Sequence, residues 1–274
     1  MTKVSVIIPT IRGREAMLAK LTSTISYKYE VIVINDEALL LAAKRNKGAS
    51  MAKGEYFLFV DDDNYFEPGA IEAAVELCER ESVGVVGFMA CYDDQKDKVA
   101  DGGSKRNYLT GFTTGVNTNA VYSTLSKEPY EVDEIANAFM VDAELYYQLQ
   151  GFDEKNFPID LDEADFCRKV KWMGLKVMVC PLARCYHKSQ TYDWVPNFRG
   201  VKSAYCMGRH RVFFQRNCNS NLRYCVYLVF FFPVFVGFYT LSLLYKKNPS
   251  MIWPFLKGAF DGLRNSPTHP YRKI

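Results

Sequence analysis

Residues 4–90 alternate between short apolar runs and longer segments with helical spacing, and this alternation restricts the fold more than any other feature. The longer segments, residues 14–25, 38–52 and 68–78, carry apolar side chains at helical intervals. The short runs are mostly rich in β-branched residues, as buried strands are, and read VSVII, YEVIVI, EYFLFV and VGVVGFMA. This pattern predicts an α/β fold with a mostly parallel sheet and helices on both of its faces.

Polar residues stand at the ends of three of these predicted strands. Pro9 and Thr10 follow the first strand, Asp36 ends the second, and residues 61–63 follow the third. In open α/β sheets, ligands bind in the crevice beyond the carboxyl ends of the strands. We therefore expect side chains that are distant in the sequence to converge on one crevice.

Three consecutive carboxylates, Asp61, Asp62 and Asp63, follow the apolar run FLFV. Asp61 and Asp63 offer hard oxygen ligands on a short turn, which suits Mg²⁺ or Mn²⁺ with positions left open for phosphate oxygens. Asp62 lies between them and either faces a donor or caps the turn. A solvated acidic loop, or an acidic helix start before Pro68, explains the stretch equally well when it is taken alone.

Charged residues near these strand ends are suited to binding a nucleotide. Asp36 can accept hydrogen bonds from a nucleoside, and Lys44 and Arg45 on the next helix can face phosphates. Each of them, taken singly, also fits an ordinary surface helix. The sequence has no Walker A loop and no Gly-x-Gly-x-x-Gly after a strand, so it does not support ATP hydrolysis or dinucleotide binding.

A second acidic cluster lies in residues 151–174, just before a predicted helix. Its four carboxylates are Asp160, Asp162, Glu163 and Asp165. A carboxylate that is partly screened from water at such a place can act as a general base. The alternative is a helix start at which acidic side chains interact favourably with the helix dipole.

The remainder of the front part is less regular. Residues 92–119 are polar and glycine-rich, which predicts irregular loops, and residues 175–180 form a further strand that ends before Pro181. The eight cysteines include no Cys-x-x-Cys pair, so a zinc site is not expected. Without a signal-peptide pattern at the start, we expect scattered reduced thiols in a cytosolic compartment.

The last part of the chain is basic and apolar. Residues 199–274 hold 12 Lys and Arg against one acidic residue, and the preceding residues hold 22 basic and 30 acidic ones. Residues 224–245 contain no charge and are long enough to cross a bilayer as one helix, although a buried core helix is the alternative. Pro233 and Gly237 also allow a kink or a re-entrant hairpin, and residues 253–263 have the spacing of an interfacial helix.

Five stretches in order carry a resemblance to a known family: VSVIIPT, VIVIND, AKGEYFLFVDDDN, GFDEKNFP and DEADFCRKV. Over residues 3–190 they resemble family 2 glycosyltransferases of the GT-A fold, and look most similar to rhamnosyl- and galactofuranosyl-type members. The resemblance implies a Rossmann-like GT-A catalytic domain over residues 1–195. Residues 196–274 would then form a basic, apolar helical tail that associates with a membrane.

The resemblance also implies roles for individual residues. Donor contacts fall to the Pro9–Thr10 turn and Asp36, and Asp61 and Asp63 match the Asp-x-Asp motif that holds the donor diphosphate through Mn²⁺ or Mg²⁺. His187 matches a histidine of the metal site. Glu163 matches the catalytic base, but many members read Glu-Asp where this chain reads Asp-Glu, so Asp162 stays a second candidate. Asp165 and Arg168 match residues that shape the start of that helix.

The activity implied is an inverting, metal-dependent glycosyl transfer from a nucleoside diphosphate sugar to a hydroxyl acceptor. A lipid-linked glycan or polysaccharide acceptor at the cytoplasmic face of a membrane fits the tail, where Arg209, Arg211 and Arg216 can meet a lipid phosphate. Nucleic acid is not an expected partner, because the aromatic residues of the tail are not interleaved with cations. A nucleotidyltransferase and a non-catalytic membrane-docked protein are the alternatives.

Overall fold

The computed structural model describes residues 3–26, 28–188, 198 and 200–264. These residues form two compact units. The first comprises residues 1–105, 114–158 and 162–190, and the second comprises residues 106–113, 159–161 and 191–274. The boundary predicted between residues 195 and 196 lies outside the described residues. Residues 106–113 and 159–161 belong to the second unit although they lie far from the rest of it in the sequence. No change in composition marks these two segments in the sequence.

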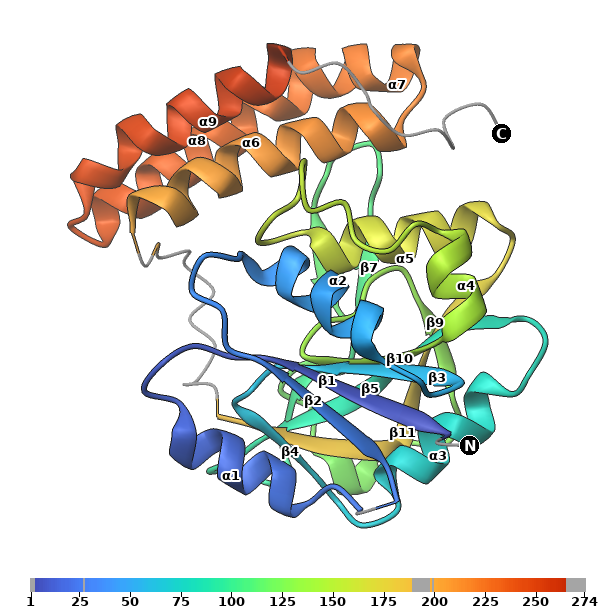
Figure 1. Ribbon diagram of the computed structural model, residues 1–274. Helices are drawn as coiled ribbons and strands as arrows, with labels where there is room; N and C mark the ends of the chain where they lie inside the picture. Colours follow the sequence, from blue (N-terminus) through green and yellow to red (C-terminus); the bar gives the residue numbers. More distant parts are fainter. Residues whose placement is uncertain (1–2, 27, 189–197, 199, 265–274) are drawn as a thin grey trace. The chain divides into compact units, whose positions relative to one another are not determined.

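A nine-stranded sheet forms the centre of the first unit (Figure 1). Strand β1 pairs in parallel with β2 and β3, and β11 pairs in parallel with β5, which confirms a mostly parallel α/β sheet. The order is β2-β1-β3-β10-β5-β11-β4, with β6 paired to β5 and β9 paired to β11. The strands are β1 (Val4–Pro9), β2 (Glu30–Ile34), β3 (Tyr56–Val60), β4 (Asn64–Phe66), β5 (Val83–Tyr92), β6 (Val99–Asp101), β9 (Tyr130–Val132), β10 (Ala138–Asp142) and β11 (Lys176–His187).

Two features of the sheet differ from the sequence expectation. Strand β10 is inserted between β3 and β5 and runs antiparallel to both, so it interrupts the parallel order. The prediction of irregular loops over residues 92–119 is wrong in part, since this stretch contains β6 and the small paired strands β7 (Ser104–Arg106) and β8 (Thr113–Gly115). These strands have three residues each, too few for a periodic pattern to be recognised.

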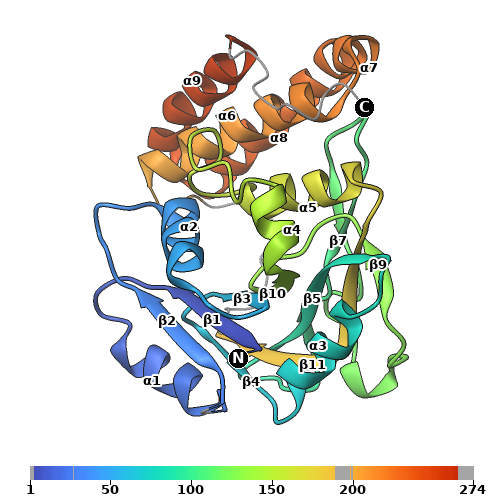
Figure 2. The ribbon, with the colours of Figure 1, turned by 45° about the vertical axis from the view of Figure 1, so that its right-hand side comes forward.

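Helices cover both faces of the sheet, as predicted (Figures 1 and 2). Val4, Val6 and Ile8 alternate along β1 and pack into one core with residues of α1 (Glu15–Ser23) and α3 (Ala70–Cys78). Ile7 points to the opposite face, which α2 (Leu41–Met51) covers. The helix approaches so closely that a Cβ at Gly48 would lie 2.3 Å from Cγ2 of Ile7. Helices α4 (Ala143–Gln148) and α5 (Asp162–Trp172) also lie on this face (Figure 2).

Strand β11 extends well past its predicted end. It continues through Pro181 to His187, with a shift of register between Cys180 and Arg184. Such a bulge accommodates a proline, which has no N–H to give to the ladder. Beyond the bulge, β11 pairs antiparallel with β4 and sets His187 opposite Asn64. The extension therefore carries His187 to the acidic turn that follows β3.

The second unit is helical. Its helices α6 (Val201–Cys218) and α9 (Ile252–Arg264) approach each other closely at small residues. A Cβ at Gly208 would lie 2.2 Å from the Phe255 oxygen, and one at Gly258 would lie 2.0 Å from the Tyr205 oxygen. Phe198, Tyr239 and Phe255 stack in the core beside them. The elements are α6 (Val201–Cys218), α7 (Asn221–Val226), the π-helical turn η2 (Tyr227–Phe231), α8 (Phe232–Tyr245), the 3₁₀ turn η3 (Pro249–Met251) and α9 (Ile252–Arg264).

The apolar segment predicted at residues 224–245 lies in one helix. Elements α7, η2 and α8 run on without a break as a helix of 25 residues, Asn221–Tyr245, and we call it the apolar helix. Among the described residues, it is the one helix whose length and composition suffice to cross a membrane. Pro233 produces a local π turn rather than a hairpin, because the missing N–H is absorbed by a local change in the hydrogen-bond ladder.

A buried histidine lies inside the second unit. His210 on α6 is 1% exposed, and its Nδ1 lies 3.2 Å from the carbonyl oxygen of Asp160. Burial lowers the pKa of His210 to about 4, and the positive charge of Arg209 acts in the same direction. The ring is therefore neutral in the folded protein near pH 7.

Acidification should destabilise the fold through His210. The unfolded chain binds a proton there near pH 6.5, whereas the folded chain does so only near pH 4, so stability is lost as the pH falls through this window. From pH 7 to 5 this residue should lower the free energy of unfolding by about 1–2 kcal/mol. Urea unfolding at both pH values measures the effect. His210→Asn, whose amide nitrogen takes the place of Nδ1 and can donate to the carbonyl without titrating, should show a smaller fall. An equal fall in both proteins would contradict the assignment.

Candidate active site

The acidic turn after β3 is held by backbone hydrogen bonds. The N–H of Asp61 donates to the Asn137 oxygen at 2.9 Å, and the N–H of Asn64 donates to the Asp61 oxygen at 3.1 Å. Asn137 has a φ of 65°, a left-handed conformation that asparagine tolerates better than most residues. The turn therefore fixes the directions in which the carboxylates of residues 61–63 leave the sheet.

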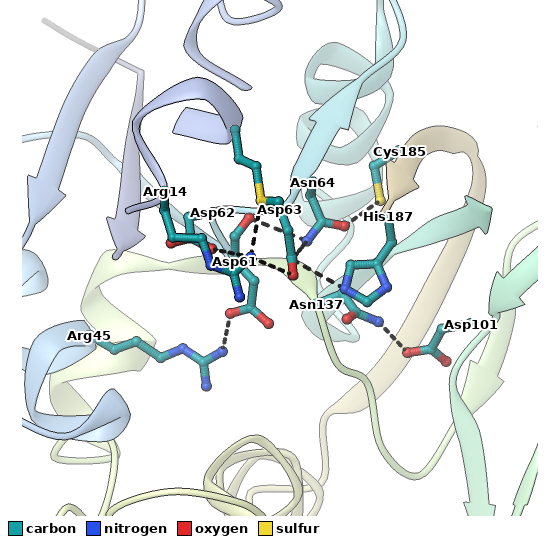
Figure 3. A network of polar contacts seen from close by, with 11 residues as sticks. Arg14, Arg45, Asp61, Asp62, Asp63, Asn64, Asp101, Asn137, Cys185 and His187 are labelled. Carbon is teal, nitrogen blue, oxygen red and sulfur yellow. Dashed lines mark hydrogen bonds and ion pairs between the residues drawn. The ribbon is translucent and has the colours of Figure 1, made fainter. Parts of the chain in front are cut away.

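Asp63 lies between an imidazole and a guanidinium (Figure 3). His187 Nε2 is 3.2 Å from Asp63 Oδ1, and Arg14 Nη1 is 3.4 Å from Asp63 Oδ2. Burial acts to raise the pKa of Asp63, but the hydrogen bond to His187 and the charges of His187 and Arg14 outweigh it and lower that pKa below its usual value. Burial acts to lower the pKa of His187, and the Asp63 carboxylate outweighs it and raises that pKa. Each of the two side chains thus favours the charged form of the other.

Arg45 joins the acidic turn to the second acidic cluster. Its side chain is 0% exposed, and its Nη2 lies 3.0 Å from Asp61 Oδ1 and 2.7 Å from Glu163 Oε1. Its Nη1 lies 2.6 Å from Asp162 Oδ2. The rings of Phe139 and Phe152 lie within 6 Å of the guanidinium carbon, at 5.7 and 5.5 Å. One buried cation therefore holds three carboxylates from two separate segments of the chain, the acidic turn and the start of α5.

Burial is the main cause of the raised pKa values of two of these carboxylates, Asp61 and Asp162. It raises the pKa of Asp61 to about 6 and that of Asp162 to about 8, although Arg45 acts in the opposite direction on both. The negative charge of Glu163 adds to both increases. For Arg45 the balance is reversed, because its three carboxylates outweigh burial and raise its pKa. Asp162 is thus protonated over much of the neutral range, while Asp61 is mostly ionised near pH 7.

The two candidates for the base differ in accessibility. The side chain of Asp162 is 0% exposed, and its Oδ1 has no hydrogen-bond partner within the described part of the chain. The Glu163 side chain is 15% exposed. Both stand in the first turn of α5, where acidic groups interact favourably with the helix dipole. Of these two side chains, that of Glu163 is the one that is partly open to solvent.

The other residues predicted on this helix make contacts along it. Asp165 is buried, with Lys169 Nζ at 3.4 Å from its Oδ2. The guanidinium carbon of Arg168 lies 5.0 Å from the centre of the Trp172 ring. Both contacts are made within α5.

Lys44 holds the Pro9–Thr10 turn through a hydrogen bond to its backbone. Its Nζ donates to the Thr10 carbonyl oxygen at 2.5 Å, and the Thr10 hydroxyl donates to Asp62 Oδ2 at 2.6 Å. Lys44 is itself buried, so it is engaged with the protein backbone here, as Arg45 is with carboxylates. Asp62 is therefore tied to the end of β1.

Asp36 lies beyond the end of β2 and keeps partial exposure. It accepts from Lys47 Nζ at 2.9 Å and from the N–H of Ala38 at 3.1 Å. The Lys47 hydrogen bond is the main cause of its lowered pKa. Its carboxylate stays ionised and partly open to solvent, as hydrogen bonding to a nucleoside requires.

Three residues of the site escaped the sequence analysis: Arg14, Asp101 and Asn137 (Figure 3). Asn137 Nδ2 donates to Asp101 Oδ2 at 2.9 Å, and burial raises the pKa of Asp101. Asp101 ends the short strand β6, inside the stretch expected to be irregular. Two signals in the sequence could have indicated them. Asp101 stands directly before Gly102-Gly103, and Arg14 stands at the start of the helix that follows the first strand.

The acidic turn offers oxygen ligands of the kind that a divalent cation shares with phosphate. The described residues contain no group of three or more His, Cys, Asp or Glu side chains arranged as metal ligands. Mg²⁺ and related ions in phosphate-binding sites usually take only one or two protein carboxylates and complete their shell with phosphate and water. Asp63 with His187, and Asp61 with 31% of its side chain exposed, offer such a donor set.

Part of the chain matches the model of a known family. Residues 37–123, which include α2, β3 and the acidic turn, match the model "Glycosyl transferase family 2". No curated protein sequence matches the chain.

Solved structures resemble the fold at low sequence identity. A structure of GalNAc-T7 with UDP, GalNAc and Mn²⁺ has a TM-score of 0.59 at 14% identity, over 78% of this chain and 50% of that one. Staphylococcus aureus TarS 1–349 with UDP-GlcNAc has a TM-score of 0.57 at 14% identity, over 96% of this chain and 81% of that one. The mannosyltransferase PcManGT of Pyrobaculum calidifontis, with GDP-Man and Mn²⁺, has a TM-score of 0.50 at 14% identity, over 98% of this chain and 77% of that one.

The chain spans about half the length of GalNAc-T7, the first of these structures. At such identities the likeness concerns the fold, which is the mixed α/β arrangement called GT-A. Residues 37–123 thus resemble the glycosyl transferase family 2 model, and the described residues share their fold with solved glycosyltransferase structures.

Proposed function

We propose that the protein is an inverting, metal-dependent glycosyltransferase that moves a sugar from a nucleoside diphosphate donor to a hydroxyl acceptor. The observation that carries this proposal is the Arg45 bridge, which holds Asp61 of the acidic turn and Glu163 of α5 on one guanidinium. A candidate metal ligand and a candidate base therefore lie side by side. The relatives bound to UDP or GDP-Man with Mn²⁺ support a donor and a cation of this kind.

Asp61, Asp63 and His187 would hold Mn²⁺ or Mg²⁺. When bound, the cation supplies positive charge that stabilises the developing charge of the leaving nucleoside diphosphate. Arg14, which lies 3.4 Å from Asp63, adds a fixed positive charge at the same edge. Thr10, Asp36 and Asp62 are the side chains that we assign to the nucleoside and the rest of the donor.

Glu163 would accept the proton of the acceptor hydroxyl. Its carboxylate is partly exposed and is oriented by Arg45, whereas Asp162 is buried and carries a raised pKa. The hydroxyl oxygen then forms its bond to the anomeric carbon from the face opposite the departing diphosphate, which inverts the configuration there. No covalent enzyme intermediate is required.

The second unit supports a proposal for the acceptor and for the cellular setting. We propose a lipid-linked glycan or polysaccharide at the cytoplasmic face of a membrane, because the apolar helix and the basic composition suit a lipid surface. For the donor, the motif order leads us to propose a deoxyhexose or hexofuranose, as in rhamnosyl- and galactofuranosyl-type enzymes.

Removal of divalent cations should abolish turnover. After a screen of nucleotide sugars for thermal stabilisation with Mn²⁺ has identified a donor, EDTA should remove the activity, and Mn²⁺ or Mg²⁺ should restore it. Asp63→Asn should weaken the response to Mn²⁺, because it removes a carboxylate that faces His187. Full turnover after thorough chelation contradicts the metal assignment. Release of pyrophosphate in place of a nucleoside diphosphate would indicate a nucleotidyltransferase.

A further inference from the structure

The apolar helix presents a large exposed face. A fully buried core helix would hide such side chains, whereas here only 28% of the most apolar window is buried. The five residues that we call the outer face recur at helical spacing and are 51–67% exposed: Val229, Phe230, Val234, Leu241 and Leu244. Contiguous exposed apolar surface of this kind marks an interaction site.

The opposite face of the apolar helix is fixed against the rest of the second unit. Phe235 and Tyr239 are buried, with ring centres 5.4 and 5.3 Å from that of Phe255 on α9. Leu243 is buried in the same core. The helix is therefore one member of a packed helical unit and not a detached segment.

Arginines of α6 lie along the apolar helix. The guanidinium carbon of Arg211 lies 5.8 Å from the ring centre of Tyr239, and that of Arg216 lies 5.9 Å from the ring centre of Tyr224. If the apolar helix crossed a bilayer in this packed form, it would carry Arg211 toward the hydrocarbon, where arginine is costly. This arrangement favours a helix that lies in the plane of the membrane surface.

Helix α9 adds a stripe typical of a membrane interface. Trp253 and Phe260 are 71% and 52% exposed, and Lys257 and Arg264 continue the same stripe at helical spacing. Aromatic and basic side chains in alternation favour the boundary between headgroups and acyl chains. Residues 200–264 contain nine Lys and Arg but one acidic residue, Asp261, so the charge matches an anionic surface.

We propose that the second unit docks on anionic lipid bilayers as an in-plane anchor, with the outer face of the apolar helix inserted at the headgroup boundary and without crossing the membrane. The partner is the lipid surface itself, recognised by apolar insertion together with the surrounding lysines and arginines. This inference rests on the membrane setting of the proposed function and is independent of the proposed catalytic step.

Flotation of the full chain with vesicles tests the lipid surface. The protein should float with vesicles of phosphatidylcholine and phosphatidylglycerol, and less with phosphatidylcholine alone, and the difference should shrink as salt rises. Phe230→Ser combined with Leu241→Ser should weaken partition by about tenfold or more. A matched pair in the first unit, Val121→Ser with Leu182→Ser, removes similarly exposed apolar side chains and should leave partition unchanged.

Flotation that is equal for both lipid mixtures, or equal for both pairs of variants, would overturn the proposal. Thermal unfolding of each variant shows whether the fold is kept. If the outer-face pair changes the sedimentation of the protein from dimer to monomer and leaves flotation intact, the surface binds a second copy of the chain instead of lipid.

Labelling of the two ends of the apolar helix tests the in-plane orientation. In a Cys225→Ser background, Asn221→Cys and Ser250→Cys each place a thiol beside one end of the helix. In sealed membrane vesicles from the expressing cells, a membrane-impermeant maleimide should reach both sites from the same side. Reaction from opposite sides would show that the helix spans the membrane and would refute the proposal.

Discussion

Glu163→Gln should lower kcat by about 10²–10⁴-fold while it leaves the affinity for the donor almost unchanged. The amide cannot take a proton from the acceptor hydroxyl at neutral pH. Its oxygen can still accept from Arg45 Nη2, which lies 2.7 Å from Glu163 Oε1, so the shape of the site should persist. Single-turnover transfer measures the chemical step, and calorimetric titration with the nucleoside diphosphate measures donor affinity.

Asp162→Asn is the matched control for this prediction. Asparagine resembles the protonated form of Asp162, which its pKa of about 8 already favours at neutral pH. Its oxygen can still accept from Arg45 Nη1, 2.6 Å from the present carboxylate. We expect a far smaller loss of kcat than for Glu163→Gln. The reverse ranking of the two variants would assign the base to Asp162.

Arg45→Met should destabilise the folded protein by about 3–5 kcal/mol, which is the range found when one partner of a buried ion pair is removed. It leaves Asp61, Asp162 and Glu163 without their shared cation. Arg45→Lys keeps the charge but not the planar fork that reaches all three carboxylates, so its loss should be intermediate. Urea unfolding at pH 7 measures the series.

The pH dependence separates this effect from a simple packing defect. Loss of the cation raises the carboxylate pKa values further, so the folded variant binds protons more readily than its unfolded chain does. Its deficit relative to the wild type should therefore grow as the pH rises from 5 to 8. A deficit independent of pH would contradict the electrostatic account. Arg12→Met is the surface control, because Arg12 is 81% exposed beside Glu37 and should contribute less than about 1 kcal/mol.

The sequence predicted the parts of the fold that rest on local patterns. Strands β1, β2, β3 and β5 and the helices between them follow from runs of β-branched residues and helical spacing. The convergence of Thr10 and Asp62, which are 52 positions apart, follows from the rule that parallel strands end at one edge. These relations need no knowledge of which distant strand pairs with which.

The rest depends on long-range pairing that no local pattern contains. The apolar run of β10 gives neither its antiparallel direction nor its place between β3 and β5. Arg45 looked like a surface cation, because its burial results from carboxylates 16, 117 and 118 positions away. Asp101 likewise acquires its place only when Asn137 is brought beside it.

The bulge in β11 acts as a spacer that selects which side chain reaches the acidic turn. It lies between Cys180 and Arg184, and the ladder beyond it pairs His187 with Asn64, next to Asp63. Because successive strand residues point to opposite faces, a spacer one residue longer or shorter would present Tyr186 or Lys188 at that rung. The length of chain between Cys180 and His187 thus determines the chemistry at Asp63 as firmly as the choice of histidine does.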